Sequence, residues 1–509
     1  MPNPPVYSLL DVLKACAPVL LALATILVLV RGARPGVDAT DAEPEPDGAV
    51  PLNRLLPAVI AVAFYLVGLW RLSAPPEMIF DEVHHARTAM EFVAGKNPHE
   101  WTHPHFAKLM MAAGIVAWNG EFDPSDGAWN AEATYSERST IGWRFPSLVF
   151  GTLALVVMYA LARQTLHSRA AAALATTFLA LDGVFFVQSR TAMTNIYTVF
   201  FILLAALGTW RYLREDRTRY LLLAGLGIGG ALASRWSSLY AWALLMLALF
   251  LHHAYVSRRD GFSPARTLRW ASLVVLGMIA VPAALYFASY IPYVLQGEQG
   301  TYNQKLFSLN YNQHGWGKVW TMQGDMWRYH SQLKEGHPYN SPWWSWPLVL
   351  RPVWYYWETD DGVTRGVWAI GNVFLWWASV PALVAAGVLA WKRRHGAIGF
   401  VVLLGLGQWL LWGVKARSLN FMHYMFESIP FVCLALAYLF HLAWTTPDPG
   451  DPAATAGSPA EFWTRRRKIV ALYCILVAAW FVFFYPLLSA LPIPQRFYDV
   501  HLWLGRPWI

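Results

Sequence analysis

Apolar stretches of about 18–25 residues recur along the entire chain, and each is long enough to cross roughly 30 Å of hydrocarbon as a helix. Hydrophobic residues make up 56% of the 509 residues and charged residues only 14%, so these stretches lack the polar faces of soluble helices. The sequence therefore predicts an all-α polytopic membrane protein of about twelve transmembrane helices. The predicted spans are 9–30, 54–72, 142–162, 170–188, 193–212, 219–234, 237–255, 270–293, 367–391, 397–414, 421–444 and 468–490.

These spans divide the chain into an 11-helix core and one added N-terminal helix. The first span could also be a signal peptide, but its leading segment is poorly basic and no A-x-A cleavage site follows it. The predicted regions are the N-terminal helix (1–31), a disordered cytoplasmic linker (32–52), a catalytic membrane module (53–293) that includes a first long loop (73–141), a second long loop (294–366), the C-terminal helices (367–490) and a tail (491–509).

The distribution of Lys and Arg predicts the orientation in the membrane. Five short loops, "RQTLHSR", "RYLREDRTR", "SRRDGFSPARTLR", "KRRHG" and "TRRRK", carry 17 basic residues, so they should face the cytoplasm. Both long loops and the C-terminal tail are then extracytoplasmic. Topology thus accounts for the net charge of +8, and no nucleic-acid partner is expected. The three cysteines lie in apolar runs, which excludes a disulfide framework and a zinc cluster.

The first long loop opens with a segment dense in ionisable groups, "IFDEVHHARTAMEFVAGKNPHEWTHPHFAK" (79–108). The adjacent carboxylates Asp81 and Glu82 could act as a general base or hold a metal ion. Basic residues also stand at outer helix ends, against the positive-inside bias; they are Lys108, Arg144, Arg190, Arg235 and Arg417. Each could extend to lipid headgroups, but together they predict a phosphate site, because Arg matches phosphate oxygens with a two-pronged fork.

The phosphate in question is expected to belong to a lipid. The chain has no P-loop and no dinucleotide fingerprint, which argues against an ATP-driven pump. The Gly-rich "GLGIGG" at 225–230 lies inside an apolar span, where it predicts close helix packing. A phosphate-bearing donor at the outer face is more plausibly carried by a lipid than by a nucleotide.

Five ordered motifs resemble the protein O-mannosyltransferases, which use dolichyl- or polyprenyl-phosphate-mannose and belong to the C-type glycosyltransferase (GT-C) superfamily. They are "IFDE", "HPHFAK", "RFPS", "QSR" and "FMHY", and "SPWWSWPLVLRPVWYYWE" (341–358) is similar to a signature of the bacterial members. The resemblance covers about 53–490 and implies a GT-C fold. The second long loop is too short for the soluble lumenal insert of the eukaryotic enzymes and, rich in Trp and Tyr, is expected to form amphipathic helices.

The resemblance implies inverting transfer of mannose from a polyprenyl phosphate to Ser or Thr hydroxyls of a protein, at the extracytoplasmic face of the cell membrane. Asp81 and Glu82 are carried over as the catalytic centre, with Asp81 as the base and Glu82 orienting the acceptor, although the sequence cannot separate the two roles. Expected contacts to the donor phosphate or sugar are His103, Lys108, Arg144, Arg190, Arg235, Arg417, His423 and Tyr424; further substrate contacts are His84, His85 and His105.

Two positions depart from the family pattern: Asn195 stands near the position of a usual Asp, and His105 replaces the second Pro of "HPP". No cofactor is required by the sequence. A divalent metal ion stays an alternative, although His84 and His85 point about 100° apart on a helix and cannot both join Asp81 at one ion. The acceptor, the prenyl length and the oligomeric state are left open.

Two other functions are compatible with the sequence. A different GT-C enzyme could move another sugar from a polyprenyl phosphate to a lipid or glycan. A transporter is the non-enzymatic alternative, and it predicts ionisable groups near the bilayer midplane together with inverted repeats. The sequence shows neither feature, because its charges cluster at one face.

Overall fold

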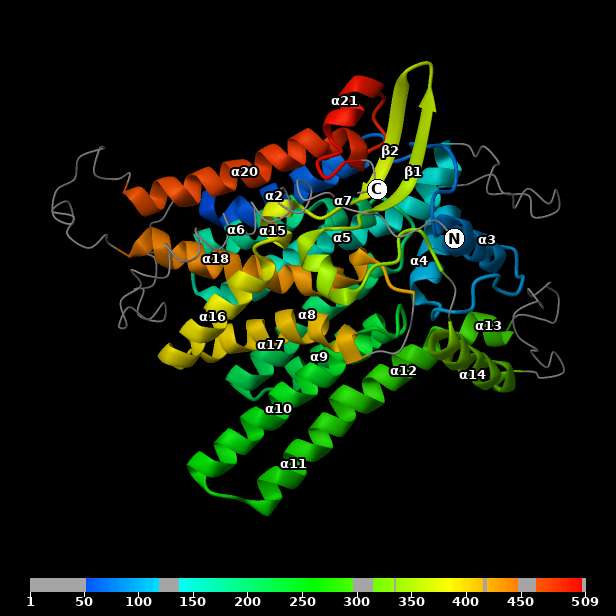
Figure 1. Cartoon of the computed structure of the whole chain (residues 1–509). Coiled ribbons are helices and arrows are strands. Elements are labelled where there is room, and N and C mark those ends of the chain that lie inside the picture. The colour runs from blue at the N-terminus through cyan, green and yellow to red at the C-terminus, as the bar shows by residue number, and fades with distance from the viewer. Residues whose placement is uncertain are drawn as a thin grey trace.

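The computed structural model describes residues 52–118, 137–295, 315–333, 336–414, 419–446 and 464–505. The predicted N-terminal span 9–30 and nearly all of the linker lie outside the described residues, as does Arg417. Within the described ranges the chain is mainly helical, and long helices run side by side (Figure 1).

Eight helical stretches of the described part are long and apolar enough to cross a membrane. They are α5 (Glu137–Leu166), α8 (Asn195–Glu215), α10 (Ser238–Asp260), α11 with α12 (Pro264–Val275, Val281–Ala288), α15 with α16 (Val373–Trp376, Ser379–Arg393), α17 (Gly396–Leu410), α18 (Ile429–Thr445) and α20 (Arg465–Leu488). Three other predicted spans fall on shorter helices, namely α2 (Leu52–Leu69), α6 (Arg169–Ala180) followed by α7 (Gly183–Gln188), and α9 (Thr218–Leu232). The predicted helical membrane architecture is confirmed.

The bundle is held together by close helix contacts around a buried centre. Nearly all of α18 is buried, from Ile429 to Ala443, which makes it the central helix of the fold. Helices α8 and α9 approach so closely that a Cβ on Gly208 would lie 2.6 Å from the backbone nitrogen of Ala224. On α9, a Cβ on Gly227 would meet the backbone nitrogen of Ala205 at 2.5 Å. The glycines of "GLGIGG" therefore serve helix packing, as the sequence indicated.

One end of the bundle carries a β-hairpin, which the all-α prediction missed. Strands β1 (Val353–Asp360) and β2 (Val363–Ala369) pair antiparallel, and the short β3 (Ile493–Pro494) adds to β2 (Figure 1). Asp361 and Gly362 connect the strands with φ of 45° and 73°, the backbone of a type I′ turn. The expectation of amphipathic helices in 294–366 was therefore wrong for residues 353–366, where aromatic and β-branched residues favour strands.

The first long loop folds into two helices, α3 (Glu82–Val93) and α4 (Phe106–Ala117), at the same end of the bundle. The second long loop contributes α14 (Trp316–Gln332), which follows the short α13 (Ile291–Leu295). A small hydrophobic cluster joins these elements; its buried members are Trp101, Tyr290, Tyr293, Val319, Met322 and Met326. Both long loops thus pack together over one end of the membrane helices.

Candidate active site

Asp81 and Glu82 stand where the chain enters α3. The preceding Phe80 has a φ of 48°, a left-handed backbone that a non-glycine residue adopts only where its surroundings fix it. Its ring stacks on Tyr355 of β1, with centroids 4.3 Å apart and planes 6° from parallel. The hydroxyl of Tyr355 accepts a hydrogen bond from Gln188 (2.7 Å). The hairpin of the second loop therefore fixes the backbone that presents the two carboxylates.

Glu82 is completely buried, and protein groups fill its hydrogen-bonding capacity. Arg144 donates through Nε to Oε1 (2.9 Å) and through Nη2 to Oε2 (2.8 Å), which forms a bidentate ion pair. The backbone N–H groups of Ile79 (3.1 Å) and Ala192 (2.9 Å) donate to the same carboxylate. Glu82 thus ties the start of α3 to α5 and to the turn before α8. Its carboxylate already accepts four hydrogen bonds, so the predicted contact between Glu82 and an acceptor would have to replace one of them.

Arg144 has a structural set of partners on every side. Besides Glu82, it donates to the carbonyl oxygens of Leu72 (3.2 Å), Pro75 (2.9 Å) and Glu77 (2.8 Å). Only 1% of the residue is exposed, so no donor is presented to a ligand in this structure. The expected contact of Arg144 with a donor phosphate does not fit this arrangement.

Asp81 differs from Glu82 both in its burial and in the use of its carboxylate oxygens. It is half-buried, and within the described residues its carboxylate makes no hydrogen bond or ion pair, not even as an N-cap of α3. Burial raises the pKa of Asp81, and the nearby Glu100 raises it further, while His84, Arg235 and His337 act in the opposite direction. A carboxylate with unused acceptor atoms and a raised pKa can take a proton from a hydroxyl group.

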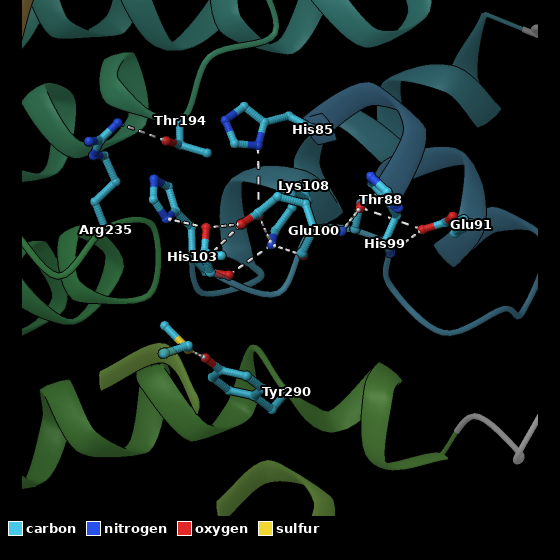
Figure 2. A network of polar contacts seen from close by, with 12 residues as sticks. His85, Thr88, Glu91, His99, Glu100, His103, Lys108, Thr194, Arg235 and Tyr290 are labelled. Atoms are coloured by element: carbon cyan, nitrogen blue, oxygen red, sulfur yellow. Dashed lines mark hydrogen bonds and ion pairs between the residues drawn. The ribbon is translucent and has the colours of Figure 1, made fainter. Parts of the chain in front are cut away.

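A second buried ion pair anchors α4 to the loop before it (Figure 2). The ammonium group of Lys108 donates to Glu100 Oε2 (2.6 Å), to the Glu100 carbonyl (2.8 Å) and to the His103 carbonyl (2.7 Å). An ammonium group has three hydrogens, so all its donors are used. The expected contact of Lys108 with phosphate therefore does not fit either. Glu100 was not predicted as the partner of Lys108, because the first long loop holds ten acidic residues and the sequence does not show which of them pairs with the buried Lys.

The histidines of the first loop have separate surroundings. His85 is buried with Nδ1 3.8 Å from Glu100 Oε2, and burial lowers the pKa of His85 to about 3. His103 lies beside His330 of α14, with ring centroids 5.5 Å apart, and burial holds the pKa of His103 well below its usual range. Both imidazoles are therefore neutral near pH 7. They can donate or accept hydrogen bonds but supply no positive charge.

Two other predicted histidines have different surroundings. His84 is exposed and stacks on His99, with centroids 5.7 Å apart. His105 is fully buried against Tyr290 (4.5 Å between centroids), and neither of its ring nitrogens has a hydrogen-bond partner among the described residues. The environment of His105 is that of an aromatic core residue, so a substrate contact would require a rearrangement.

A cavity of about 440 Å³ opens between the N-terminal end of α10 and helix α14. Its lining residues are His103, Arg235, Trp236, Ser237, Leu239, Tyr240, Trp327, His330, Ser331 and Trp412. Among the predicted cations that the structure describes, Arg235 and not Lys108, Arg144 or Arg190 lines this cavity. The rest of the wall is mainly aromatic and apolar, with polar atoms from two histidines and two serines, which suits a lipid-linked ligand that carries a sugar and one anionic group.

Arg235 is positioned by residues of α8 and of the late turn 421–428. Its Nη1 donates to Asn195 Oδ1 (2.6 Å) and to Thr194 Oγ1 (3.4 Å), and its guanidinium lies over the ring of Tyr424, 5.3 Å from the centroid. Asn195, the departure from the family pattern, is a neutral acceptor for this cation. His423 is buried with Nδ1 3.5 Å from the Tyr355 hydroxyl. Tyr424 thus contacts Arg235, and His423 lies next to Tyr355.

The described part of the chain holds no group of three His, Cys, Asp or Glu side chains that could bind a metal ion.

Residues 58–294 match the family model described as dolichyl-phosphate-mannose-protein mannosyltransferase. Residues 315–507 match the model of the C-terminal four-transmembrane region of protein O-mannosyltransferase. Together the two matches extend over most of the chain.

The chain belongs to the protein O-mannosyltransferase family. The polyprenol-phosphate-mannose–protein mannosyltransferase of Mycobacterium tuberculosis (strain H37Rv) is 25% identical over 514 residues, covering 89% of this chain and 92% of the relative. The enzyme of the same name from Corynebacterium glutamicum is 25% identical over 506 residues, covering 88% and 91%.

Solved structures show that the fold is that of the family. The Saccharomyces cerevisiae Pmt1–Pmt2 complex bound to the sugar donor aligns with a TM-score of 0.71 at 15% identity, covering 89% of this chain and 92% of that chain. ArnT from Cupriavidus metallidurans bound to undecaprenyl phosphate aligns with a TM-score of 0.50 at 14% identity, covering 85% and 70%. The predicted GT-C glycosyltransferase fold is therefore confirmed, and the protein is a multi-pass membrane protein.

Proposed function

We propose that the chain transfers mannose from polyprenyl-phosphate-mannose to Ser or Thr hydroxyls of proteins, with inversion, at the extracytoplasmic membrane face. Membership of the mannosyltransferase family and the names of the two bacterial relatives support the donor and the protein acceptor. The observation that carries the mechanism is the contrast between the adjacent carboxylates. Glu82 is saturated by Arg144 and two backbone N–H groups, whereas Asp81 keeps its acceptor atoms unused.

In this mechanism Asp81 accepts the proton of the acceptor hydroxyl. The hydroxyl oxygen then bonds to C1 of mannose as the bond from C1 to the phosphate oxygen breaks. The bonding electrons leave with the lipid phosphate, which needs a cation and no acid to protonate it. Arg235 supplies that cation from the cavity wall, and its charge stabilises the developing phosphate in poorly solvated surroundings.

The other predicted site residues receive different roles from their surroundings. His103, with a neutral ring on the cavity wall, is placed to hydrogen-bond to the sugar or the phosphate. Glu82, Arg144 and Lys108 are positioning residues, because their polar atoms are used within the protein. Tyr424 and His423 position Arg235 and the hairpin tyrosine.

The proposal is tested with purified full-length protein, radiolabelled polyprenyl-phosphate-mannose and a Ser/Thr/Pro-rich peptide. We expect mannosyl peptide of inverted anomeric configuration, and loss of product in Asp81→Asn at unchanged protein level. Transfer from a polyprenyl phosphate carrying another sugar, or to a lipid alone, would favour the other GT-C activity. Movement of intact donor across proteoliposomes without product would favour a transporter.

The orientation is tested separately with single cysteines in a cysteine-free background. Asp361 lies in the turn of the β-hairpin, and Asp216 ends α8 at the opposite end of the bundle. A cysteine at Asp361 should react with a membrane-impermeant maleimide in intact cells. A cysteine at Asp216 should react only after permeabilisation, and the reverse pattern would place the site in the cytoplasm.

A further inference from the structure

A second ligand-sized space lies on the membrane face of the bundle, away from the cavity of Arg235. It is an open groove of about 520 Å³ between α2 and α20, lined by Leu66, Val67, Trp70, Phe481, Val482 and Tyr485. No residue of this groove lines the cavity of Arg235. Side chains on both walls are open to the surroundings: Leu66 is 58% and Val482 71% exposed.

The groove has an apolar end and an aromatic end. Helices α2 and α20 both end at the side of the molecule that carries the hairpin (Figure 1). Leu66 and Phe481 lie one turn further from that side than Trp70 and Tyr485, whose rings stack with planes 9° from parallel. Aromatic rings of this kind favour the headgroup level of a membrane, and aliphatic side chains favour the acyl-chain level. The groove therefore has the polarity of a lipid molecule.

Two arginines stand behind the aromatic end without an acidic partner. Arg190 is 5% exposed; its Nη2 donates to the carbonyls of Trp70 (3.1 Å) and Arg71 (2.7 Å), whereas its Nε and Nη1 have no hydrogen-bond partner. Arg71 donates through Nη2 to the Ala490 carbonyl (3.3 Å), and its buried Nε also has no partner. Within the described residues, neither guanidinium forms an ion pair with a carboxylate.

This arrangement is costly without an anion. The buried guanidinium of Arg190 reaches carbonyl oxygens and lies over the Phe186 ring, 5.4 Å from its centroid, but no full negative charge compensates it, and the two cations repel each other. Burial lowers the pKa of Arg190 to about 10; Tyr485 acts in the opposite direction, and the neighbouring Arg144 and Arg71 lower the pKa further. Extension to bulk headgroups does not relieve Arg190, because its side chain is enclosed. A phosphate oxygen at the aromatic end would meet Arg71, which is partly exposed, and the charge of Arg190 behind it would strengthen the attraction without direct contact, because the unpartnered atoms of Arg190 are covered.

We propose that the groove between α2 and α20 binds one anionic phospholipid of the outer leaflet, with its phosphate at Arg71, in front of the covered charge of Arg190, and an acyl chain along Leu66 and Val482. The groove is open along the side of the bundle, so its occupant enters from the bilayer. It is a different site from the one that holds the donor in the proposed function.

The phospholipid would also affect the active site, because Arg190 is close in the sequence to residues that hold Glu82 and Arg235. Arg190 lies two residues before Ala192, whose N–H donates to Glu82, and close to Thr194 and Asn195, which hold Arg235. A lipid phosphate that offsets the charge of Arg190 would therefore stabilise the turn 190–195, which supports both Glu82 and Arg235. Anionic lipid is expected to raise transfer as well as to bind.

The test is a lipid titration of the purified full-length protein, followed by native mass spectrometry in detergent. Phosphatidylglycerol, phosphatidylcholine and polyprenyl phosphate are titrated in separate arms. We expect one tight phosphatidylglycerol per chain, at least tenfold tighter than phosphatidylcholine. The double variant Arg71→Gln/Arg190→Gln should lose at least tenfold in phosphatidylglycerol affinity. Val482→Trp should lose a similar factor by filling the groove without changing a charge.

The matched control is Arg365→Gln, because Arg365 is an arginine of β2 at the same end of the molecule that pairs with Glu358 (3.2 Å). It should bind phosphatidylglycerol like the wild type. Equal affinity for phosphatidylcholine, or unchanged binding in Val482→Trp, would overturn the proposal even if the double arginine variant fails to fold. One-for-one displacement of phosphatidylglycerol by polyprenyl phosphate would show instead that the groove holds the donor's lipid.

Discussion

The two adjacent carboxylates can be separated by one chemical change made at each position. Asp81→Asn and Glu82→Gln both replace a carboxylate oxygen with an NH2 group and keep the shape of the side chain. From their surroundings we expect opposite results. Asp81→Asn should abolish transfer in a stable protein, whereas Glu82→Gln should destabilise the fold and lose activity for that reason.

The magnitudes follow from the partners of each group. Glu82 accepts two hydrogen bonds from Arg144 and one each from the N–H groups of Ile79 and Ala192. A Gln amide would turn its NH2 group toward these donors and leave Arg144 as an uncompensated buried charge. Breaking a buried ion pair in this way costs roughly 3–5 kcal/mol.

The stability of Asp81→Asn has the opposite sign. Burial raises the pKa of Asp81 above its ordinary value of 3.8, so its ionisation weakens the folded state as the pH rises from 3.8 through the raised folded value. At neutral pH the Asn variant lacks this penalty, and its stability should equal or exceed that of the wild type. Transfer should fall by roughly 100-fold or more, the usual contribution of a general base.

The assay compares thermal unfolding with single-turnover transfer for both variants, with donor binding measured on the same preparations. Asp81→Asn should bind donor like the wild type and fail to transfer. The reasoning fails if Asp81→Asn transfers at the wild-type rate, or if Glu82→Gln unfolds at the wild-type temperature.

Three further predictions use the same preparations. Lys108→Met and Glu100→Gln should each destabilise the fold by roughly 3–5 kcal/mol, and the double variant should recover part of the loss in thermal unfolding, because no buried charge is left alone. Arg235→Ala should lower kcat/KM for the donor, because it removes roughly 2–4 kcal/mol of transition-state stabilisation, and Arg235→Lys should restore part of the loss. Full activity in both variants would exclude the phosphate contact. Transfer should decline as the pH falls through the raised pKa of Asp81, with no decline due to His85, whose pKa is about 3; a pH profile unchanged in shape by His85→Gln would confirm the second point.

The membrane helices were predictable because the bilayer imposes their length and composition. All eleven predicted spans that lie in the described residues fall on helices, including the short α9, whose glycines signalled close packing. The hairpin was missed although its signal was present. "VWYYWETDDGVTRGVWA" is rich in aromatic and β-branched residues on both sides of an Asp-Gly pair, a strong short-range hairpin signal. Because the aromatic residues were interpreted as a membrane-surface feature, the strands on both sides of the turn were not predicted.

The cationic cluster was predictable as a set of residues but not as one site. The basic residues at helix ends that depart from the positive-inside bias were correctly predicted to need partners. The structure gives them three different kinds of surroundings. Arg144 and Lys108 pair with carboxylates, Arg235 lines the cavity, and Arg190 meets carbonyl oxygens and the ring of Phe186. Sequence position shows which end of a helix a residue occupies, but the partner depends on how helices far apart in the chain are arranged around one another. Contacts such as Arg144 with Glu82, 62 residues apart, carry no local signal.

The roles of the two carboxylates did carry a local signal. The buried residues of α3 include Glu82, His85, Ala86 and Ala89, which follow the spacing i, i+3, i+4, i+7 of one helix face. Small alanines at two of these positions indicate that this face packs closely against the protein, so Glu82 had to be buried and therefore paired. Asp81 precedes the helix and is turned about 100° away from that face. A carboxylate that starts a helix outside its buried face keeps its acceptor atoms unused. This difference in direction makes Glu82 a structural residue that holds the start of α3 in place, and it leaves Asp81 available as a base.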